Sequence, residues 1–287
     1  MFTWERVCGA RPAVMGVINV TPDSFSDGGE FVEPGAAIAH GIELAERGAD
    51  ILDVGGESTR PGAAPVTAEE ETERVLLVVQ GLSAATQVPV SIDTTKAAVA
   101  RAALDAGAVI VNDVSAGRFD PDIFGVTARA GAGYVAMHML GEPRTMQLDP
   151  RYDDVLAEVG DFLVERIEAA HAAGIRPGAV AADPGIGFGK TVEHNLQLLA
   201  GLPMLAHRVP VPLLIGTSRK TFIGRVLARA TKAPDELAVD EREEGTLATV
   251  AWAVEHGASV VRVHDVRPAA QAIRLLDAMR AVAEGAA

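Results

Sequence analysis

The chain has 287 residues, of which 48% are hydrophobic and only 4% are aromatic, and its formal net charge is −14. A core of Ala, Val, Leu and Ile on this scale suits a single large domain with parallel strands buried on both faces. The acidic charge repels nucleic acid and anionic membranes at long range, so neither is an expected partner.

The first residues, the absence of long apolar runs and the cysteine content bear on the expected location of the protein. The first residues, MFTWERVCGARP, are charged at Glu5 and Arg6 and lack an apolar run of signal-peptide length. No segment has the roughly 18 consecutive apolar residues of a membrane span. The single cysteine, Cys8, excludes a disulfide framework and a cysteine-based zinc site. We therefore expect a cytoplasmic protein.

Short apolar runs alternate with helical patterns along the chain, which indicates strand–helix units and a parallel sheet. The expected strands are 13–19, 49–54, 88–93, 108–112, 133–138, 179–183, 211–216 and 259–264. Helical spacing is clearest in 34–47, 68–80, 96–106, 152–173 and 245–256. Four helical segments end in a glycine suited to a left-handed cap: Gly48, Gly107, Gly131 and Gly257.

Eight such units favour a closed (β/α)8 barrel, the TIM barrel, as one domain over 1–287 with a core of about 12–282. The alternative is an open, doubly wound sheet, which binds its ligand at one switch point. Polar residues end nearly every expected strand, which favours the barrel because a barrel gathers all its strand ends at one mouth. These residues are Asn19, Asp53, Asp93, Asn112, Asp113, His138, Asp183, Ser218, Arg219, Lys220, Arg262 and His264.

Two loops are long and rich in Gly, Pro and Ser, namely 20–33 and 55–67. Loops of this kind in a compact domain usually bind ligands or cover a site, so we expect them to close over the mouth. The segment 230–241 resembles an irregular insertion between the last two strands.

Four of the strand-end residues can together recognise a flat heterocycle. Asp93 and Asp183 can each accept two parallel N–H bonds, Asn112 can donate and accept, and Lys220 can donate to a ring carbonyl or nitrogen. Each residue taken alone could instead cap a turn or form an internal ion pair. Their common place at strand ends favours a shared binding pocket.

A second group is cationic and consists of Arg60, Arg262 and His264. Residues 262 and 264 alternate along a strand and point the same way, and arginine binds phosphate through two hydrogen bonds. A helix expected to start near 267–268 adds positive potential. The group therefore predicts a phosphate site, with a strand-end salt bridge as the alternative.

Other residues allow weaker interpretations. Asn19 offers a neutral oxygen to Mg²⁺, and Asp23 and Asp27 on the same loop could assist. The segment GIGFGK at 185–190 lacks the spacing of a nucleotide phosphate loop, and its Phe188 is better placed as a wall of the pocket. Met137 can pack on a ring face, and His138 is more typical of a satisfied core residue. The remaining cations, Arg144, Lys190 and Arg219, have no assigned role beyond a generally cationic mouth.

At these residues the sequence resembles the dihydropteroate synthases, pterin-binding enzymes with a TIM barrel. The matching segments run in order along nearly the whole chain: MGVINVTPDSFSDGG (15–29), DVGGESTRPGA (53–63), SIDT (91–94), NDVSA (112–116), MH (137–138), GEPRTMQ (141–147), DPGIGFGKT (183–191), GTSRK (216–220), EGTLAT (244–249) and RVHDV (262–266).

The resemblance implies a role for each matching residue. Asp93, Asn112, Asp183 and Lys220 would hold a pterin with Met137 against its face, and Asn19 would ligate the Mg²⁺ cofactor. Pyrophosphate would be bound by Thr59, Arg60, Arg262 and His264, and p-aminobenzoate by Phe25, Pro61, Phe188, Ser218 and Lys220. Arg60, Lys220, Arg262, His264 and Asp27 would act in catalysis. The resemblance also implies a homodimer that sulfonamides inhibit.

The implied reaction is the condensation of a dihydropterin pyrophosphate with p-aminobenzoate. An aryl amine attacks without prior deprotonation, so catalysis would rest on positioning and electrostatics rather than on a side-chain nucleophile. The alternatives are a pterin-dependent methyltransferase domain, an inactive pterin-binding paralogue and a generic sugar-phosphate barrel enzyme. The first would not need Arg60, Arg262 and His264 together, the second would be expected to lose them, and the third would usually show a clear base or Schiff-base lysine.

Overall fold

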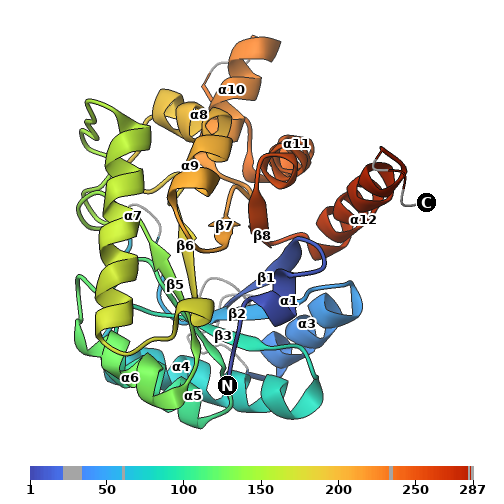
Figure 1. Ribbon diagram of the computed structural model, residues 1–287. Helices are drawn as coiled ribbons and strands as arrows, with labels where there is room; N and C mark the ends of the chain where they lie inside the picture. The colour runs from blue at the N-terminus through green and yellow to red at the C-terminus, as the bar shows by residue number, and fades with distance from the viewer. Residues whose placement is uncertain (22–33, 60–61, 233–234, 284, 286–287) are drawn as a thin grey trace.

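The computed structural model describes residues 1–21, 34–59, 62–232, 235–283 and 285 of the chain. Its parallel strands pair in chain order, and the last strand pairs with the first, which closes a barrel (Figure 1). The strands are β1 (Ala13–Asn19), β2 (Ile51–Gly55), β3 (Val90–Asp93), β4 (Ile110–Asp113), β5 (Gly133–Met137), β6 (Val180–Asp183), β7 (Leu213–Ile215) and β8 (Ala258–Val263). The predicted (β/α)8 barrel is confirmed, and the open sheet is excluded.

Helices surround the strands on the outside of the barrel (Figure 1). They are α3 (Pro34–Glu46), α4 (Ala68–Ala85), α5 (Ala97–Asp105), α6 (Asp122–Ala130), α7 (Val155–Ala172), α8 (Val192–Ala200), α9 (Leu202–Arg208), α10 (Thr221–Thr231), α11 (Glu243–Glu255) and α12 (Val266–Ala283). Short 3-10 turns, η1 (Pro177–Ala179) and η2 (Val239–Arg242), precede β6 and α11. The segment expected to be an insertion, 230–241, includes the last two residues of α10 and most of η2.

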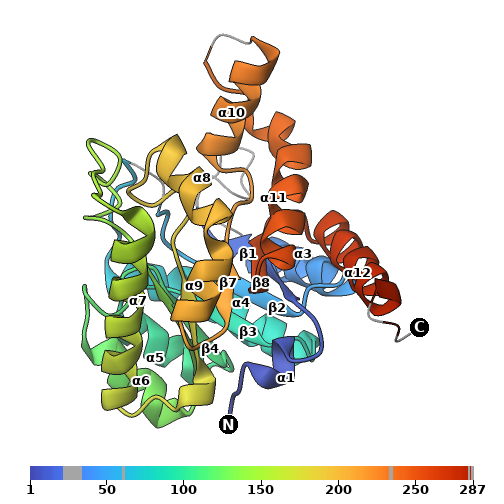
Figure 2. The same cartoon turned by 45° about the horizontal axis from the view of Figure 1, so that its top comes forward.

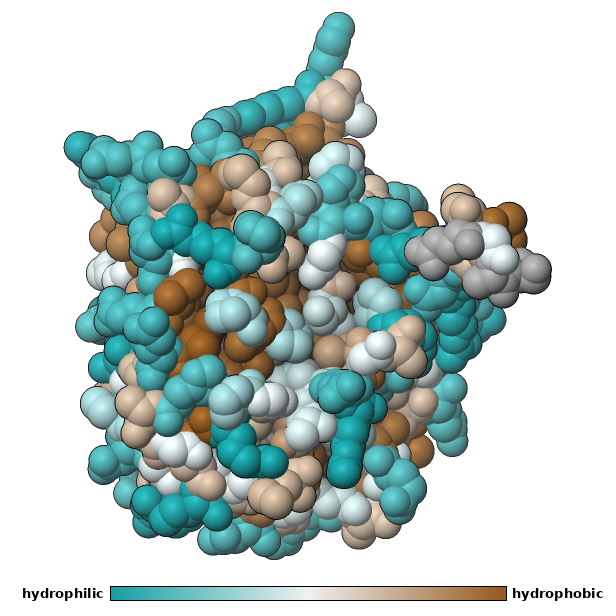
Figure 3. Space-filling model, in the orientation of Figure 1, coloured by the Kyte–Doolittle hydropathy of each residue, from teal (hydrophilic) through white to brown (hydrophobic). Residues whose placement is uncertain are grey.

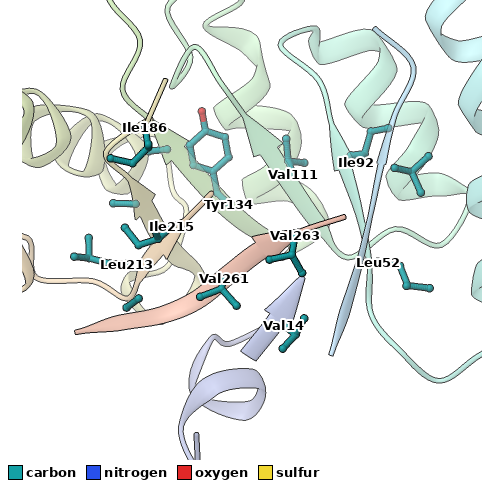
Figure 4. Packing of buried hydrophobic residues seen from close by; sticks show 14 of the residues in the cluster. Val14, Leu52, Ile92, Val111, Tyr134, Ile186, Leu213, Ile215, Val261 and Val263 are labelled. Atoms are coloured by element: carbon teal, nitrogen blue, oxygen red, sulfur yellow. The ribbon is translucent and has the colours of Figure 1, made fainter. Parts of the chain in front are cut away.

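The two largest parts of the core follow from the alternation of side chains along each strand. Outward-facing residues such as Val14, Leu52, Ile92 and Val111 pack between the strands and the helices (Figure 4). Inward-facing residues form a separate apolar cluster inside the barrel: Ala13, Met15, Ile51, Ile110, Val135, Ala181, Leu214 and Val260.

The beginning of the chain closes the barrel at the amino ends of the strands. Trp4, just before the short helix α1 (Glu5–Cys8), joins the inner cluster and is only 1% exposed. Its indole Nε1 donates to the carbonyl oxygen of Ala179 over 3.0 Å, and its ring meets Phe2 edge to face. Helix α1 lies below the strands in Figure 2. The packed structure therefore begins upstream of residue 12.

Glycines end helices as the sequence indicates. All four predicted cap glycines have positive φ, for example 116° at Gly107 and 63° at Gly131, a backbone region that favours glycine. Each turn reverses the chain from the outer helix into the next strand. The turns from these helices into the next strands thus use a backbone conformation that glycine adopts readily.

The surface is largely polar on the face shown in Figure 3, where hydrophilic side chains cover much of the outer helices. Apolar side chains appear between them in patches. In the described part of the chain no helix is long and apolar enough to cross a membrane.

Replacing Trp4 by alanine is expected to lower the free energy of unfolding by about 3–5 kcal/mol, because the barrel interior loses a large buried ring. Urea unfolding followed by circular dichroism measures this change. The exposed Leu148, at 81% accessibility, is the control. Leu148→Ala should stay within about 0.5 kcal/mol of the unmodified protein. Equal effects of the two substitutions would contradict the role given to Trp4.

Candidate active site

Strand alternation directs the predicted polar residues into the barrel mouth, because side chains two positions apart point to the same face. For four of these residues, and for Met137, the inner apolar cluster contains the residue two positions earlier. These pairs are Ile51 and Asp53, Ile110 and Asn112, Val135 and Met137, Ala181 and Asp183, and Val260 and Arg262. The barrel is therefore apolar at its amino end and polar at its carboxyl end.

A cavity of about 470 Å³, measured out to its open mouth, lies at this carboxyl end. Ten predicted site residues line it: Thr59, Asp93, Asn112, Met137, Asp183, Phe188, Ser218, Lys220, Arg262 and His264. The sequence analysis did not name three other lining residues, Val114, Ile186 and Gly216. The predicted gathering of these side chains at one mouth is confirmed.

Arg262 holds the centre of this site. Its Nε donates to Asp53 Oδ2 and its Nη2 donates to Asp93 Oδ2, each over 2.7 Å. Asp53 Oδ2 also accepts a hydrogen bond of 3.0 Å from Asn112 Nδ2. Asp93 and Asn112 of the predicted heterocycle group therefore share one network with Arg262 of the predicted phosphate group.

Asp53 belongs to this network, although the sequence analysis gave it no role in binding or catalysis. It is fully buried, and within the described chain the hydrogen bonds of its side chain reach only Arg262 and Asn112, both through Oδ2. One signal in the sequence indicated that Asp53 could belong to the site: like Asp93 and Asp183, it lies at the end of an expected strand. Its partners lie 59 and 209 residues further along the chain, so the sequence could not reveal the contact.

Burial brings the pKa values of the two predicted heterocycle acids toward neutrality. Burial raises the pKa of Asp183 to about 6, although a hydrogen bond from the Gly185 N–H and the charge of Lys220 oppose this rise. Burial also raises the pKa of Asp93, which Arg262 lowers and the neighbouring Asp53 raises. The site can therefore exchange protons near physiological pH.

Lys220 interacts with both the Asp183 carboxylate and the Phe188 ring. Burial lowers its pKa to about 8, and Asp183 opposes that shift. The ammonium nitrogen lies 4.0 Å from the centre of the Phe188 ring. Phe188 in turn packs on a small apolar cluster that contains Met137 and Val114. The cavity therefore combines an apolar wall with acids and an ammonium, as a flat polar ring would require.

His264 differs from the prediction that it is a cation. Burial, and after it the charge of Arg262, lower the pKa of His264 to about 3, so the ring is neutral at pH 7. The Ser218 hydroxyl lies 3.0 Å from His264 Nδ1 and accepts from the His264 backbone N–H over 3.2 Å. Among the described residues of the predicted phosphate group, Arg262 is thus the cation.

The loop after β2 is fastened at its base. Lys96 Nζ donates to Glu57 Oε2 over 2.6 Å and to Glu71 Oε2 over 2.5 Å. The other carboxylate oxygen of Glu57 accepts from the backbone N–H of Val66, which brings the two ends of the loop together. This clasp places Thr59 at the cavity. Five predicted loop residues lie outside the described residues: Asp23, Phe25, Asp27, Arg60 and Pro61.

Asn19 ends β1 on the inward-facing side of the strand, in register with Ala13 and Met15 of the inner cluster. It is half-buried and does not itself line the cavity. Among the described residues no group of three His, Cys, Asp or Glu side chains could hold a metal ion. A metal at Asn19 would therefore need water or substrate oxygens as its other ligands.

The prediction that Lys190 contributes to a generally cationic mouth is wrong. Its side chain is only 3% exposed and lies behind the cavity wall. Arg219 is exposed and pairs with Asp265, with Nη2 and Oδ1 2.8 Å apart. Arg144 is exposed. His138 is a buried core residue, as expected, and burial lowers its pKa to about 2.

Asp53→Asn is expected to lower the pKa of Asp93. The amide oxygen can keep both hydrogen bonds, and the amide nitrogen can take the place of Oδ1, a buried atom with no hydrogen-bond partner among the described residues. Only the negative charge that repels the Asp93 carboxylate is then removed. Carboxyl ¹³C NMR titration measures the change. The exposed Asp149→Asn is the control, and an unchanged or higher pKa of Asp93 in the Asp53 variant would contradict this account.

Comparison with known proteins agrees with the site. A family model described as pterin binding enzyme matches residues 15–264. The chain is 46% identical over 279 residues to the dihydropteroate synthase of Synechocystis sp., an alignment that covers 97% of this chain and 92% of the relative.

Two solved structures of Xanthomonas albilineans dihydropteroate synthase are also similar. The one with 4-aminobenzoic acid has a TM-score of 0.86 and 48% identity, and the one in complex with 7,8-dihydropteroate has a TM-score of 0.83 and 45% identity. Each comparison covers 94% of both chains. The closed barrel, the polar residues gathered at its mouth and these similarities together show that the chain belongs to the dihydropteroate synthases, within the pterin-binding enzymes.

Proposed function

We propose that the chain joins p-aminobenzoate to 6-hydroxymethyl-7,8-dihydropterin pyrophosphate and releases 7,8-dihydropteroate and pyrophosphate. The observation that carries the proposal is the single cavity in which Asp93, Asn112, Asp183 and Lys220 meet Arg262. The two Xanthomonas albilineans structures, one with 4-aminobenzoic acid and one with 7,8-dihydropteroate, support it. Relatives named as synthases over nearly the whole chain do not favour a methyltransferase domain or a sugar-phosphate enzyme.

Recognition of the pterin would rest on the buried acids. An aminopyrimidinone edge presents two parallel N–H groups, which one carboxylate can accept. Asp183 accepts the Gly185 N–H through Oδ1, and the second lone pair of Oδ1 together with Oδ2 can accept from the ligand. Met137 and Phe188 supply apolar surface for a flat ring, and Lys220 supplies donors beside Phe188.

The pyrophosphate would lie toward Arg262, His264 and the amino end of α12, which begins at Val266. A guanidinium and a helix amino end both favour anions. To bind pyrophosphate, Arg262 would have to exchange part of its pairing with Asp53 and Asp93. A bound pterin makes this exchange easier, because its N–H groups can replace the guanidinium as donors to a carboxylate.

Magnesium fits this site in a limited way. The carboxamide oxygen of Asn19 is a suitable hard ligand, and Mg²⁺ commonly keeps waters and takes its remaining ligands from substrate phosphates. When bound, the ion would neutralise charge on the departing pyrophosphate. Asn19 would hold it as the protein ligand.

The reaction breaks the C–O bond between the pterin methylene and the pyrophosphate and forms a C–N bond. The lone pair of the aryl amine attacks the methylene, and the nitrogen then loses a proton to solvent or to the departing pyrophosphate. The residues of the mouth hold the two substrates in line and stabilise the charge that develops on the leaving group. No covalent intermediate with a side chain is required.

We further propose that two copies of the chain associate through α11 and α12, which lie side by side (Figures 1 and 2). Leu275, Met279 and Val282 of α12 recur at helical spacing and are 64%, 59% and 68% exposed, and Trp252 of α11 is 46% exposed. An apolar stripe of this kind is typical of an interface. A cytoplasmic location completes the proposal, since the chain carries one cysteine and proteins of oxidising compartments usually carry disulfides.

An assay of pyrophosphate release tests the proposed reaction. Release is expected only with the dihydropterin pyrophosphate, p-aminobenzoate and Mg²⁺ together, and a chelator should abolish it. Asn19→Ala should raise the Mg²⁺ concentration needed for half-maximal turnover, because the protein ligand is lost. An inactive pterin-binding paralogue would bind the pterin without releasing pyrophosphate, and that outcome would overturn the proposal.

Asp183→Asn separates capture of the pterin from the later steps. Its amide nitrogen cannot accept the N–H bonds of the pterin, so the Kd for the dihydropterin pyrophosphate should rise roughly tenfold to a hundredfold. In the unmodified protein the affinity should fall as the pH drops through about 6, because the Asp183 carboxylate becomes protonated. Isothermal titration at several pH values measures both effects.

Met279→Asp is expected to convert the dimer into a monomer, because a charge on the apolar stripe would be buried without a partner. Light scattering after size-exclusion chromatography measures the mass. Leu148→Asp changes an exposed apolar residue outside this surface and is the control. A monomeric unmodified protein, or a dimeric Met279 variant, would contradict the proposed interface.

A further inference from the structure

Lys190 is a buried lysine that the proposed chemistry does not use. Its ammonium donates to His138 Nδ1 over 2.9 Å and to the carbonyl oxygen of Phe188 over 3.0 Å, and lies 5.9 Å from the centre of the Tyr152 ring. These contacts are neutral groups, although burying an ammonium is costly. Burial lowers the pKa of Lys190 to about 7. A core position of this kind would be more stable with an apolar side chain of similar size.

The imidazole of His138 anchors the ammonium to the end of β5. The ring is neutral and packs edge to face on Phe162, with centres 4.8 Å apart. Because a lysine ammonium can only donate, Nδ1 accepts and the hydrogen of the neutral ring lies on Nε2. The backbone N–H of His138 donates to the Asp183 carbonyl oxygen over 2.9 Å, so this anchor joins β5 to β6.

The segment from Gly185 to Gly189 needs such an anchor. Gly185, Gly187 and Gly189 have φ values of 67°, 83° and 63°, and glycines have no side chain with which to pack. Side chains from outside the segment hold it by its backbone. Asn195 Oδ1 accepts the Gly187 N–H over 2.7 Å, Tyr152 donates to the Gly189 carbonyl over 2.9 Å, and Lys190 donates to the Phe188 carbonyl.

Phe188 connects this anchor to the cavity. Its carbonyl is held by Lys190 from behind, while its ring lines the cavity and lies 4.0 Å from the ammonium of Lys220. Lys190 is also linked to Asp183 through His138, whose Nδ1 accepts from the ammonium over 2.9 Å and whose backbone N–H donates to the Asp183 carbonyl oxygen over 2.9 Å. The positive charges that lower the pKa of Asp183 most are those of Lys220, Lys190 and Arg262, in that order.

We propose that Lys190 is a positioning residue, which fixes the Phe188 ring against Lys220 from behind the cavity wall and keeps Asp183 ionised. It acts through Phe188 and Asp183 and does not itself touch the substrates. This inference rests on the proposed function for its kinetic consequences, but not for its structural ones.

Lys190→Met tests the role, with Tyr152→Phe as the matched control. The methionine variant loses both the hydrogen bond to Phe188 and the charge near Asp183. Its KM for p-aminobenzoate should rise roughly tenfold or more. As the pH is lowered, its pterin binding should be lost at a higher pH than in the unmodified protein, because Asp183 becomes protonated earlier. Tyr152→Phe removes another hydrogen bond to the same loop without removing a charge, so it should leave the pH dependence of pterin binding unchanged.

Two results would overturn the proposal. One is a folded Lys190→Met protein with the KM and pH profile of the unmodified chain. The other is an identical upward pH shift in Tyr152→Phe, which would show that loop packing rather than charge controls Asp183. Lys190→Arg keeps a charge and a donor and should bring the pH profile back toward that of the unmodified protein.

Magnetic resonance of the ligand-free proteins decides the structural part without turnover. The contact between the Phe188 ring and the Lys220 side chain should give a nuclear Overhauser effect in the unmodified protein that is lost in Lys190→Met. Its persistence would overturn the positioning role even if the chain proved inactive. If Lys190→Met does not fold, the ¹³Cε signal of Lys190 in the unmodified protein must shift when p-aminobenzoate binds, and no shift would overturn it.

Discussion

The mouth of the barrel depends on one guanidinium held between two carboxylates. Asp53 and Asp93 lie on neighbouring strands and point into the same space, and burial there disfavours both charges. The positive charge of Arg262 offsets the repulsion between the two carboxylates. The carboxylates in turn fix the guanidinium in place, since each one pairs with a different nitrogen of it. Removing one member of such a buried group typically costs about 3–5 kcal/mol, because the remaining charges lose their partner. The same contacts orient Asn112 through Asp53.

This arrangement makes the site both rigid and responsive. The carboxylates stand on strands whose inner faces are packed below them by apolar residues, so their positions are fixed before any ligand arrives. Burial raises the pKa values of Asp93 and Asp183 toward neutrality, so a ligand that donates hydrogen bonds or brings charge changes the ionisation of these two acids readily. Preorganised charge of this kind is what a reaction without a side-chain nucleophile requires.

Much of the fold and many of the site residues could be predicted, because they depend on local periodicity. Apolar runs of strand length, glycine-ended helices and polar strand ends are visible in the sequence, and β1 was predicted to the residue. Asp93, Asn112 and Asp183 follow from the same pattern. The start of β2 was predicted two residues early, at 49 instead of Ile51, because Ala49 continues the apolar run directly after the Gly48 turn.

What could not be predicted depends on contacts between distant segments. Asp53 meets Arg262 only when β2 and β8 reach the same mouth, and the burial that neutralises His264 follows from the packing around it. Lys190 follows a glycine-rich segment, which is typical of an exposed loop. Its burial depends on the path of that segment past His138 and Tyr152. Phe25, Asp27, Arg60 and Pro61 remain predictions, as does Mg²⁺ at Asn19.

The closure of the barrel also constrains when the protein can fold during synthesis. Ala13 pairs with Val260, and the indole of Trp4 bonds to Ala179, so these early segments of the chain can complete their packing only after much later segments have been made. Until β8 emerges, β1 exposes an unpaired edge of the kind that recruits strands from other chains. Slow translation of the segment between β7 and β8 would prolong that exposure, and the growing chain would depend on chaperones most strongly until β8 has emerged.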